Sequence, residues 1–145
     1  MASFVKFNCF VADIGLEKHN LNTDTLKVYL SNEAPVVATD TAYRAAGGAD
    51  TGPEEIANGN GYTAGGEDVT NTWSQTGGVA TLAIGADIVW TAAGGTIGPF
   101  RYAVLYNDTD AGKVLIGYWD YGSAITLQIG ETFTFDMTTS LWTLT

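Results

Sequence analysis

The stretch that most constrains the fold is the run from Gly98 to Phe135, because it alternates short β-rich segments with turn residues. Pro99 has no backbone N–H to donate to a sheet, so it marks the entrance of a strand, and residues 101–106 supply the β-branched and aromatic side chains typical of strands. The run therefore predicts an antiparallel meander without a catalytic signature. Its other expected strands are residues 113–119, 125–129 and 132–135, with turns at 107–112 and 120–123.

The composition agrees with a single β domain. At 145 residues the chain is long enough to bury one hydrophobic core. Its 18 glycines and three prolines, with abundant threonine, favour short strands joined by tight turns over long helices. We therefore expect an all-β protein, either an antiparallel β-sandwich or a jelly-roll-like barrel, which have nearly the same strand pattern in sequence.

Further segments carry strand patterns outside this run. In residues 25–31, Leu26, Val28 and Leu30 alternate with other residues and should point inward. Residues 3–14 are rich in β-branched and aromatic side chains and also favour a strand. The remaining expected strands are residues 69–73, 79–84, 88–92 and 141–144, with turns at Gly77-Gly78 and at residues 85–87. The simplest expected pairing is a hairpin of 79–84 with 88–92.

The N-terminal segment allows two interpretations. Phe4 and Phe7 either complete the core of this domain or, if residues 1–8 form an exposed arm, anchor a neighbouring subunit. The first interpretation is preferred.

A glycine-rich segment over residues 47–68 predicts a long loop, and such loops in compact domains are generally functional or disordered. One short helical turn is expected at residues 53–57, where Pro53 suits the first helical position and the following glutamates face the positive end of the helix dipole. Tyr62 lies between glycines, so we expect it to hold the loop down on the sheet.

The charge of the chain excludes some partners. Six Lys and Arg residues stand against 16 Asp and Glu residues, for a formal net charge of −10. Without a basic stripe, direct binding to nucleic acid or to an anionic membrane is not expected. No segment has the roughly 20 apolar residues that span a bilayer, and no signal peptide is recognisable, so synthesis in the cytoplasm is expected.

No residue pattern predicts catalysis, a cofactor or a metal site. His19 is the only histidine and Cys9 the only cysteine, so a Cys–His pair would have to form across the fold. The pairs Glu54-Glu55 and Glu67-Asp68 lack the separation of glycosidase carboxylates and are expected to be solvated loop charges. We therefore expect a protein that is not an enzyme.

Residues 107–110, Asn-Asp-Thr-Asp, alternate oxygen ligands as the start of a calcium loop does. The later ligands of that motif are missing. A turn in which Asn and Asp side chains bind their own backbone, with Gly112 at positive φ, explains the residues better.

The densest aromatic cluster is formed by Tyr118, Trp119 and Tyr121. Because successive strand residues point to opposite faces, either Trp119 or the two tyrosines should reach the outer surface. Exposed aromatics serve as interface anchors or as platforms for sugars. The candidate interface residues are therefore Phe4, Phe7, Tyr62, Tyr118, Trp119 and Tyr121.

Four longer segments resemble recurring segments of a family of small structural proteins of tailed bacteriophages. The resemblance covers most of the chain and includes no active-site motif. The segments are HNLNTDTLKVYLSNEAP (19–35), EEIANGNGYTAGG (54–66), GPFRYAVLYND (98–108) and LIGYWDYGSAITLQIGETFTF (115–135).

The resemblance implies a virion component, most plausibly a capsid decoration or cement protein on the outer surface of the head. Its expected partners are the major capsid protein and further copies of itself, as a trimer or alternatively a dimer. The N-terminal segment and the glycine-rich loop are the expected contact regions. The competing expectation is a tail or fibre protein that binds a receptor or glycan through Trp119 and Tyr121.

Overall fold

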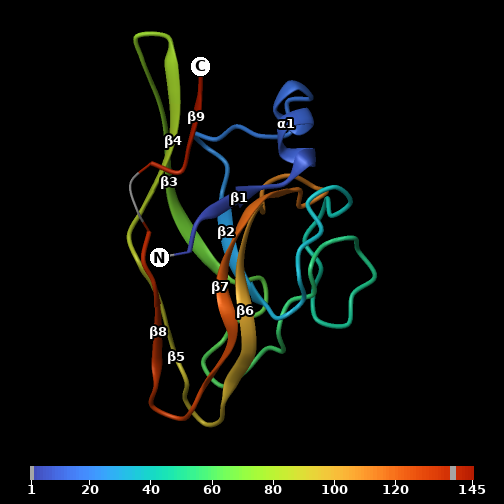
Figure 1. Ribbon diagram of the computed structural model, residues 1–145, viewed down its shortest axis with the longest axis vertical. Helices are drawn as coiled ribbons and strands as arrows, with labels where there is room; N and C mark the ends of the chain where they lie inside the picture. Colours follow the sequence, from blue (N-terminus) through green and yellow to red (C-terminus); the bar gives the residue numbers. More distant parts are fainter. Residues whose placement is uncertain (1, 138–139) are drawn as a thin grey trace.

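A curled antiparallel sheet of seven strands forms the body of the protein (Figure 1). The computed structural model describes residues 2–137 and 140–145. The expectation of an all-β sandwich or barrel-like fold is confirmed. In spatial order the strands are β1 (Phe4–Lys6), β7 (Leu115–Leu127), β6 (Ile97–Asn107), β2 (Leu26–Ser31), β3 (Glu67–Thr76), β4 (Val79–Gly85) and β9 (Trp142–Leu144).

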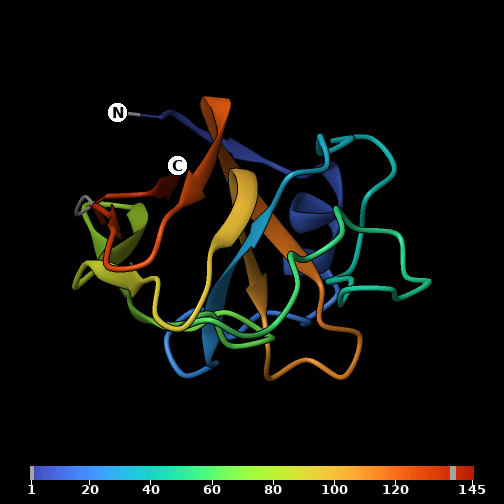
Figure 2. The ribbon, with the colours of Figure 1, turned by 90° about the horizontal axis from the view of Figure 1, so that it is seen from below.

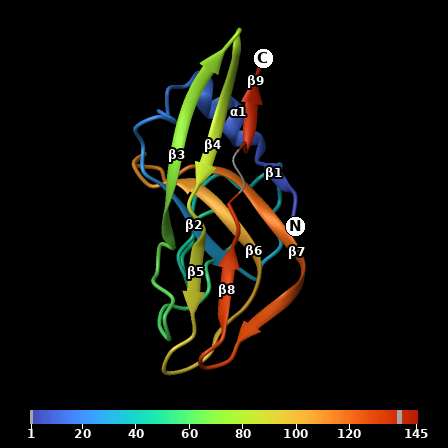
Figure 3. The same ribbon diagram turned by 90° about the vertical axis from the view of Figure 1, so that its left-hand side faces the viewer.

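A second layer is formed by a long ribbon that faces the central strands (Figure 3). Strands β5 (Ile88–Thr91) and β8 (Thr132–Phe135) pair with each other, and β4 pairs with β9 in nearly the same register further along the ribbon. Between the two paired parts, the Met137 N–H donates to Asp87 Oδ1 at 3.0 Å. The chain therefore folds back over its own sheet to make a sandwich.

The predicted hairpin of residues 79–84 with 88–92 is wrong. Strand β4 pairs instead with β3 through the expected turn at Gly77-Gly78. Both glycines have positive φ, 59° and 85°, which suits the tight turn that matches strand twist. At Ala86 the chain continues in the same direction instead of reversing, so β5 reaches β8.

The main core fills the space between the two layers. Trp119 packs edge-on against Phe135, with ring centroids 4.8 Å apart, and Phe100 packs against Phe133 at 5.0 Å. The three expected inward residues of β2, Leu26, Val28 and Leu30, are fully buried in this core.

A second, smaller core lies on the opposite face of the central strands. It contains Phe7, Tyr29, Tyr102, Val104, Tyr106 and Leu115. The segment between β2 and β3 passes over this side of the sheet, at the right of Figure 2. The central strands are therefore buried on both faces, which explains why Tyr29 has no exposed surface although it points away from the main core.

The N-terminal segment belongs to the domain. Residues 4–6 form β1, which pairs with β7, and the following residues form the helix α1 (Asn8–Gly15) instead of the strand expected over residues 3–14. Phe10 and Asp13 are the buried residues of this two-turn helix, so packing against the sheet decides its conformation. Phe7 is fully buried, which agrees with the core interpretation and leaves no free arm over residues 2–8. Met1 lies outside the described residues.

The helical turn expected at residues 53–57 is replaced by extended chain. Glu54 forms a bridge with Arg44, and Glu55 forms one with Ser31 of β2. Within residues 2–137 and 140–145, α1 is the one α-helix, and it is too short to cross a membrane.

Strand β7 is longer than the strand that the sequence predicted at residues 113–119. The expected turn at residues 120–123 is a bulge within one continuous strand. Tyr102 of β6 pairs with Asp120 and Phe100 of β6 pairs with Ile125, so β7 has extra residues between these two pairs. Gly122 supplies a φ of 83° at this bulge. The strand expected at 125–129 is therefore the end of β7, whereas the strand expected at 132–135 is confirmed as β8.

Substitution of Gly66 tests how closely the glycine-rich loop approaches β2. A Cβ at this position would lie 2.0 Å from the Val28 carbonyl oxygen, at a φ of 75°. We expect Gly66→Ala to lower the free energy of unfolding by roughly 3 kcal/mol or more, measured by urea denaturation. Gly94→Ala is the matched control, because its φ of 82° is similar but no atom lies within 4 Å; it should cost only about 1 kcal/mol. Equal losses would contradict the close approach.

Candidate functional site

None of the six aromatic residues predicted as an interface is exposed in the domain. Phe7, Tyr62 and Trp119 are buried, and Phe4, Tyr118 and Tyr121 are partly buried against the two cores. The exposed large apolar residues lie elsewhere. They are Val5, Val11, Leu16, Val36, Val79, Val89, Ile129 and Leu144.

The aromatic cluster on β7 divides between the two faces of the sheet. Trp119 contacts Phe4, with ring centroids 5.0 Å apart, and Tyr121 packs on Phe133 at 5.1 Å, so both point toward the main core. Tyr118 points to the other face and packs on Phe7 at 5.5 Å. Residues 119 and 121 are two apart on one strand, so their side chains share the face toward the main core. Neither of the two predicted arrangements is therefore observed. Burial raises the pKa of Tyr121 to about 12.

Cys9 and His19 have separate hydrogen-bond partners. The Cys9 thiol faces the backbone carbonyls of Leu115 and Asp40, at 3.5 and 3.6 Å. Burial, together with the negative charge of Asp13, raises the pKa of the thiol to about 11, so it is not an activated nucleophile. Within residues 2–137 and 140–145, no group of three or more His, Cys, Asp or Glu side chains is placed to hold a metal ion.

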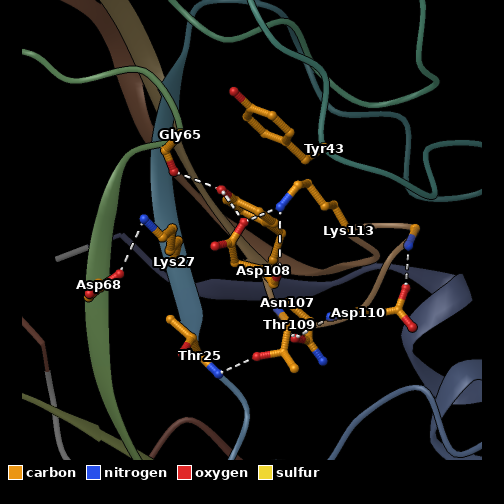
Figure 4. A network of polar contacts seen from close by, with 12 residues as sticks. Thr25, Lys27, Tyr43, Gly65, Asp68, Asn107, Asp108, Thr109, Asp110 and Lys113 are labelled. Carbon is orange, nitrogen blue, oxygen red and sulfur yellow. Dashed lines mark hydrogen bonds and ion pairs between the residues drawn. The ribbon is translucent and has the colours of Figure 1, made fainter.

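The segment predicted as a turn at residues 107–112 is organised by the fully buried Asn107 (Figure 4). Its side-chain Oδ1 accepts hydrogen bonds from the N–H groups of Thr109 and Asp110, at 2.9 and 3.2 Å. The turn interpretation is therefore confirmed. The positive φ, 46°, belongs to Lys113, however, and not to Gly112 as expected.

The side-chain amide of Asn107 also reaches the segment that follows α1. Its Nδ2 donates to the Lys18 carbonyl at 3.0 Å and to Asp24 Oδ2 at 2.7 Å, which uses both of its hydrogens, and it lies 3.2 Å from His19 Nδ1. The other ring nitrogen of His19, Nε2, is buried and has no hydrogen-bond partner among the described residues.

Charged pairs flank this turn. Lys113 pairs with Asp108, and Lys27 of β2 pairs with Asp68 of β3 at 3.3 Å (Figure 4). The Tyr106 hydroxyl donates to the Gly65 carbonyl at 2.8 Å. These contacts join the ends of β2, β3 and β6 to the glycine-rich loop.

The buried carboxylate of Glu55 is the principal polar group beneath the loop. Its Oε1 accepts from the Tyr62 hydroxyl and from the Gly65 N–H, both at 2.7 Å, and its Oε2 accepts from the Tyr43 hydroxyl at 2.5 Å. Burial and the neighbouring Glu55 raise the pKa values of Tyr43 and Tyr62, so both hydroxyls stay protonated as donors.

The expectation that Glu54 and Glu55 are both solvated is wrong for Glu55. Glu55 is only 3% exposed, whereas Glu54 lies at the surface and pairs with Arg44. Burial of Glu55 is possible because three donors converge on it. Its adjacent residue cannot share that environment, since the two side chains of an extended chain point in opposite directions.

A surface pocket of about 410 Å³ lies between the end of α1, the segment that follows it and strand β3. Two of its lining residues, Trp73 and His19, are the ends of a row of four rings. Trp73 stacks on Trp142, Trp142 packs edge-on against Phe10, and Phe10 packs against His19. The lining residues are Ile14, Glu17, His19, Asn20, Leu21 and Trp73.

Helix α1 ends beside this pocket in a Schellman motif. The Lys18 N–H donates to the Asp13 carbonyl at 3.0 Å, and the Glu17 N–H donates to the Ile14 carbonyl at 3.3 Å. Glu17 occupies the left-handed position of the motif, with a φ of 60°. Glycine is the usual residue there, so a strained glutamate is held at the rim of the pocket.

The outer ends of β3, β4 and β9 project from the body as a finger, residues 74–81 and 143–145 (Figure 1). Two of the exposed apolar residues lie on it, Val79 at 37% and Leu144 at 46% exposure. Leu144 pairs with Ala80, so it points to the face opposite Val79. Sequence analysis missed this feature, although the glycine turn at residues 77–78 indicated a hairpin tip.

The chain matches no family model, no curated protein sequence and no solved structure.

Replacement of Glu55 tests the anchor of the loop. We expect Glu55→Leu to lower the free energy of unfolding by about 3 kcal/mol or more, because two hydroxyls and one N–H lose their acceptor. Glu55→Gln should cost less, since its amide oxygen can still accept from Tyr62 and Gly65. The control Glu67→Gln, at the start of β3, should stay within about 0.5 kcal/mol of the wild type. A Glu55→Leu variant as stable as this control would contradict the assigned role.

His19 gives the protein a defined response to acid. Burial lowers its pKa below the ordinary 6.5, against the opposing effect of Asp13, Asp110 and Asp24 and with a small contribution from Lys18. The unfolded chain therefore binds more protons just below pH 6.5, and the free energy of unfolding falls as the solution is acidified through this interval.

Denaturation of the wild type and of His19→Gln across this interval measures the effect. The variant should lose part of the pH dependence, because it has no group to protonate at this position. An identical pH dependence in both proteins would contradict the burial of a neutral His19.

Proposed function

We propose that the protein is a capsid decoration protein of a tailed bacteriophage, which binds the outer head shell and bridges neighbouring capsid subunits. The segments that resemble phage structural proteins motivate this proposal. The finger, as a projecting element with an exposed apolar residue on each face, is the observation that carries it.

A finger with two apolar faces suits a bridging role. Val79 and Leu144 point in opposite directions, so each can contact a different subunit when the finger lies between two of them. Each contact is small, but many copies on one closed shell together resist detachment. Association of the decoration protein into a trimer would multiply the contacts of each unit further.

The attachment of the glycine-rich loop to the sheet supports a rigid protein, instead of a flexible one, as the bridge between subunits. Glu55 and the surrounding tyrosines hold the loop on the sheet, so its exposed tip at residues 45–51 keeps a constant position relative to the finger. The excess of acidic residues supports a protein–protein role outside the shell instead of contact with packaged DNA.

The alternative, a tail or fibre protein that binds a glycan through Trp119 and Tyr121, has less support. It needs a solvent-facing aromatic groove, but Trp119 is only 8% exposed and Tyr121 packs on Phe133.

The finger is tested by charge substitution. We expect the double variant Val79→Lys, Leu144→Lys to lose binding to purified heads that lack this protein, because each lysine would have to be desolvated in the contact. Co-sedimentation with the heads measures binding, and thermal unfolding should show that the fold is retained, since both residues are exposed.

Val89→Lys is the matched control. Val89 is 55% exposed on β5, in the part of the ribbon away from the finger (Figure 3). It should bind heads as the wild type does. Retained binding by the double variant would contradict the role of the finger, and failure of the wild-type protein to bind heads would contradict the proposed function itself.

A further inference from the structure

We propose that the pocket between α1 and β3 binds a neutral saccharide. This inference does not depend on the proposed function, because it concerns a different surface and is tested on the isolated protein. The volume of the pocket, about 410 Å³, falls within the range of small-ligand sites, roughly 300–1,000 Å³.

The pocket offers an apolar ring with a restrained orientation. Trp73 lines it and is stacked on Trp142, with ring centroids 6.2 Å apart and planes inclined by 22°. Trp142 is itself held by Phe10, at 5.1 Å. A restrained indole gives a ligand a large apolar contact at low cost in conformational entropy. Sugar rings have apolar C–H faces that fit such a surface.

The polar groups of the pocket include both donors and acceptors. Glu17 supplies a carboxylate, Asn20 a side-chain amide, and His19 a buried ring nitrogen, Nε2, that pairs with no described residue. A sugar hydroxyl both donates and accepts, so one class of ligand can use all three, and it can pair with Nε2 in either tautomer of the ring. A ligand hydroxyl beside His19 would also relieve the cost of burying this nitrogen unpaired.

The surrounding charge disfavours an anionic ligand. Glu17 lines the pocket and Asp13 and Asp24 lie near His19, so a phosphate or an acidic sugar would be repelled. The nearby Lys18 pairs with Asp13 at 3.2 Å and is not among the lining residues.

Glu17 adds an independent observation. Its left-handed backbone, with a φ of 60°, is a conformation that glycine would adopt with less strain. Strained residues of this kind gather at ligand sites, where the structure holds a required side chain in place. The carboxylate at the pocket rim is the side chain that this position supplies.

The test is a titration of the isotope-labelled protein with cellobiose, maltose, lactose and N,N′-diacetylchitobiose, followed by the indole N–H resonance of Trp73 and by the backbone N–H resonance of Asn20, which every variant retains. At least one disaccharide should shift these resonances saturably. Trp73→Ala should weaken that binding about tenfold or more through loss of the stacking surface. No saturable shift with any of the four sugars would overturn the proposal, and so would saturation by tetramethylammonium alone.

Glu17→Gly keeps the proposal falsifiable if Trp73→Ala fails to fold. Because glycine suits the left-handed position, this variant should unfold at the same or a higher temperature than the wild type. Its affinity for the disaccharide should nevertheless fall by about threefold or more, since a hydrogen bond is lost. The control Glu67→Gln should bind as the wild type does. Undiminished binding by Glu17→Gly would overturn the role given to the pocket.

Discussion

The position of the glycine-rich loop on the sheet depends on the burial of the Glu55 carboxylate. A carboxylate away from water is costly unless donors surround it, and here Tyr43, Tyr62 and Gly65 provide them. The Tyr62 hydroxyl also accepts from the Leu30 N–H of β2, at 3.1 Å. One side chain thus fastens a glycine-rich loop to a central strand of the sheet.

Attachment of the loop buries the second face of the central strands. Once the loop covers Tyr29, Val104 and the other residues of the second core, β2 and β6 are buried on both faces. The aromatic residues are then used inside the domain, in contacts such as Trp119 with Phe135 and Tyr43 stacked on Tyr106. The projecting finger and the pocket beside α1 lie outside these buried contacts, and Trp73 and His19 are the rings that line the pocket.

Periodicity predicted several elements because their contacts are local or strongly patterned. The alternation in residues 25–31 predicted the inward face of β2, and the glycine pair predicted the turn at residues 77–78 but not the pairing of β4 with β3. The strand at 132–135 was likewise predictable. Helix α1 was not, because an eight-residue segment with aromatic and β-branched side chains has little intrinsic preference for a helix and is stabilised by packing.

Composition and patterning alone therefore determined the all-β class, the acidic character of the chain and the turn chemistry around Asn107. Only the tertiary structure decided which strands pair, which glutamate of the 54–55 pair is buried, and which aromatic residues reach the surface. The physical reason is that pairing and burial depend on groups far apart in sequence. Glu55 meets Tyr43, and Trp73 meets Trp142, only after the chain has folded back over its own sheet.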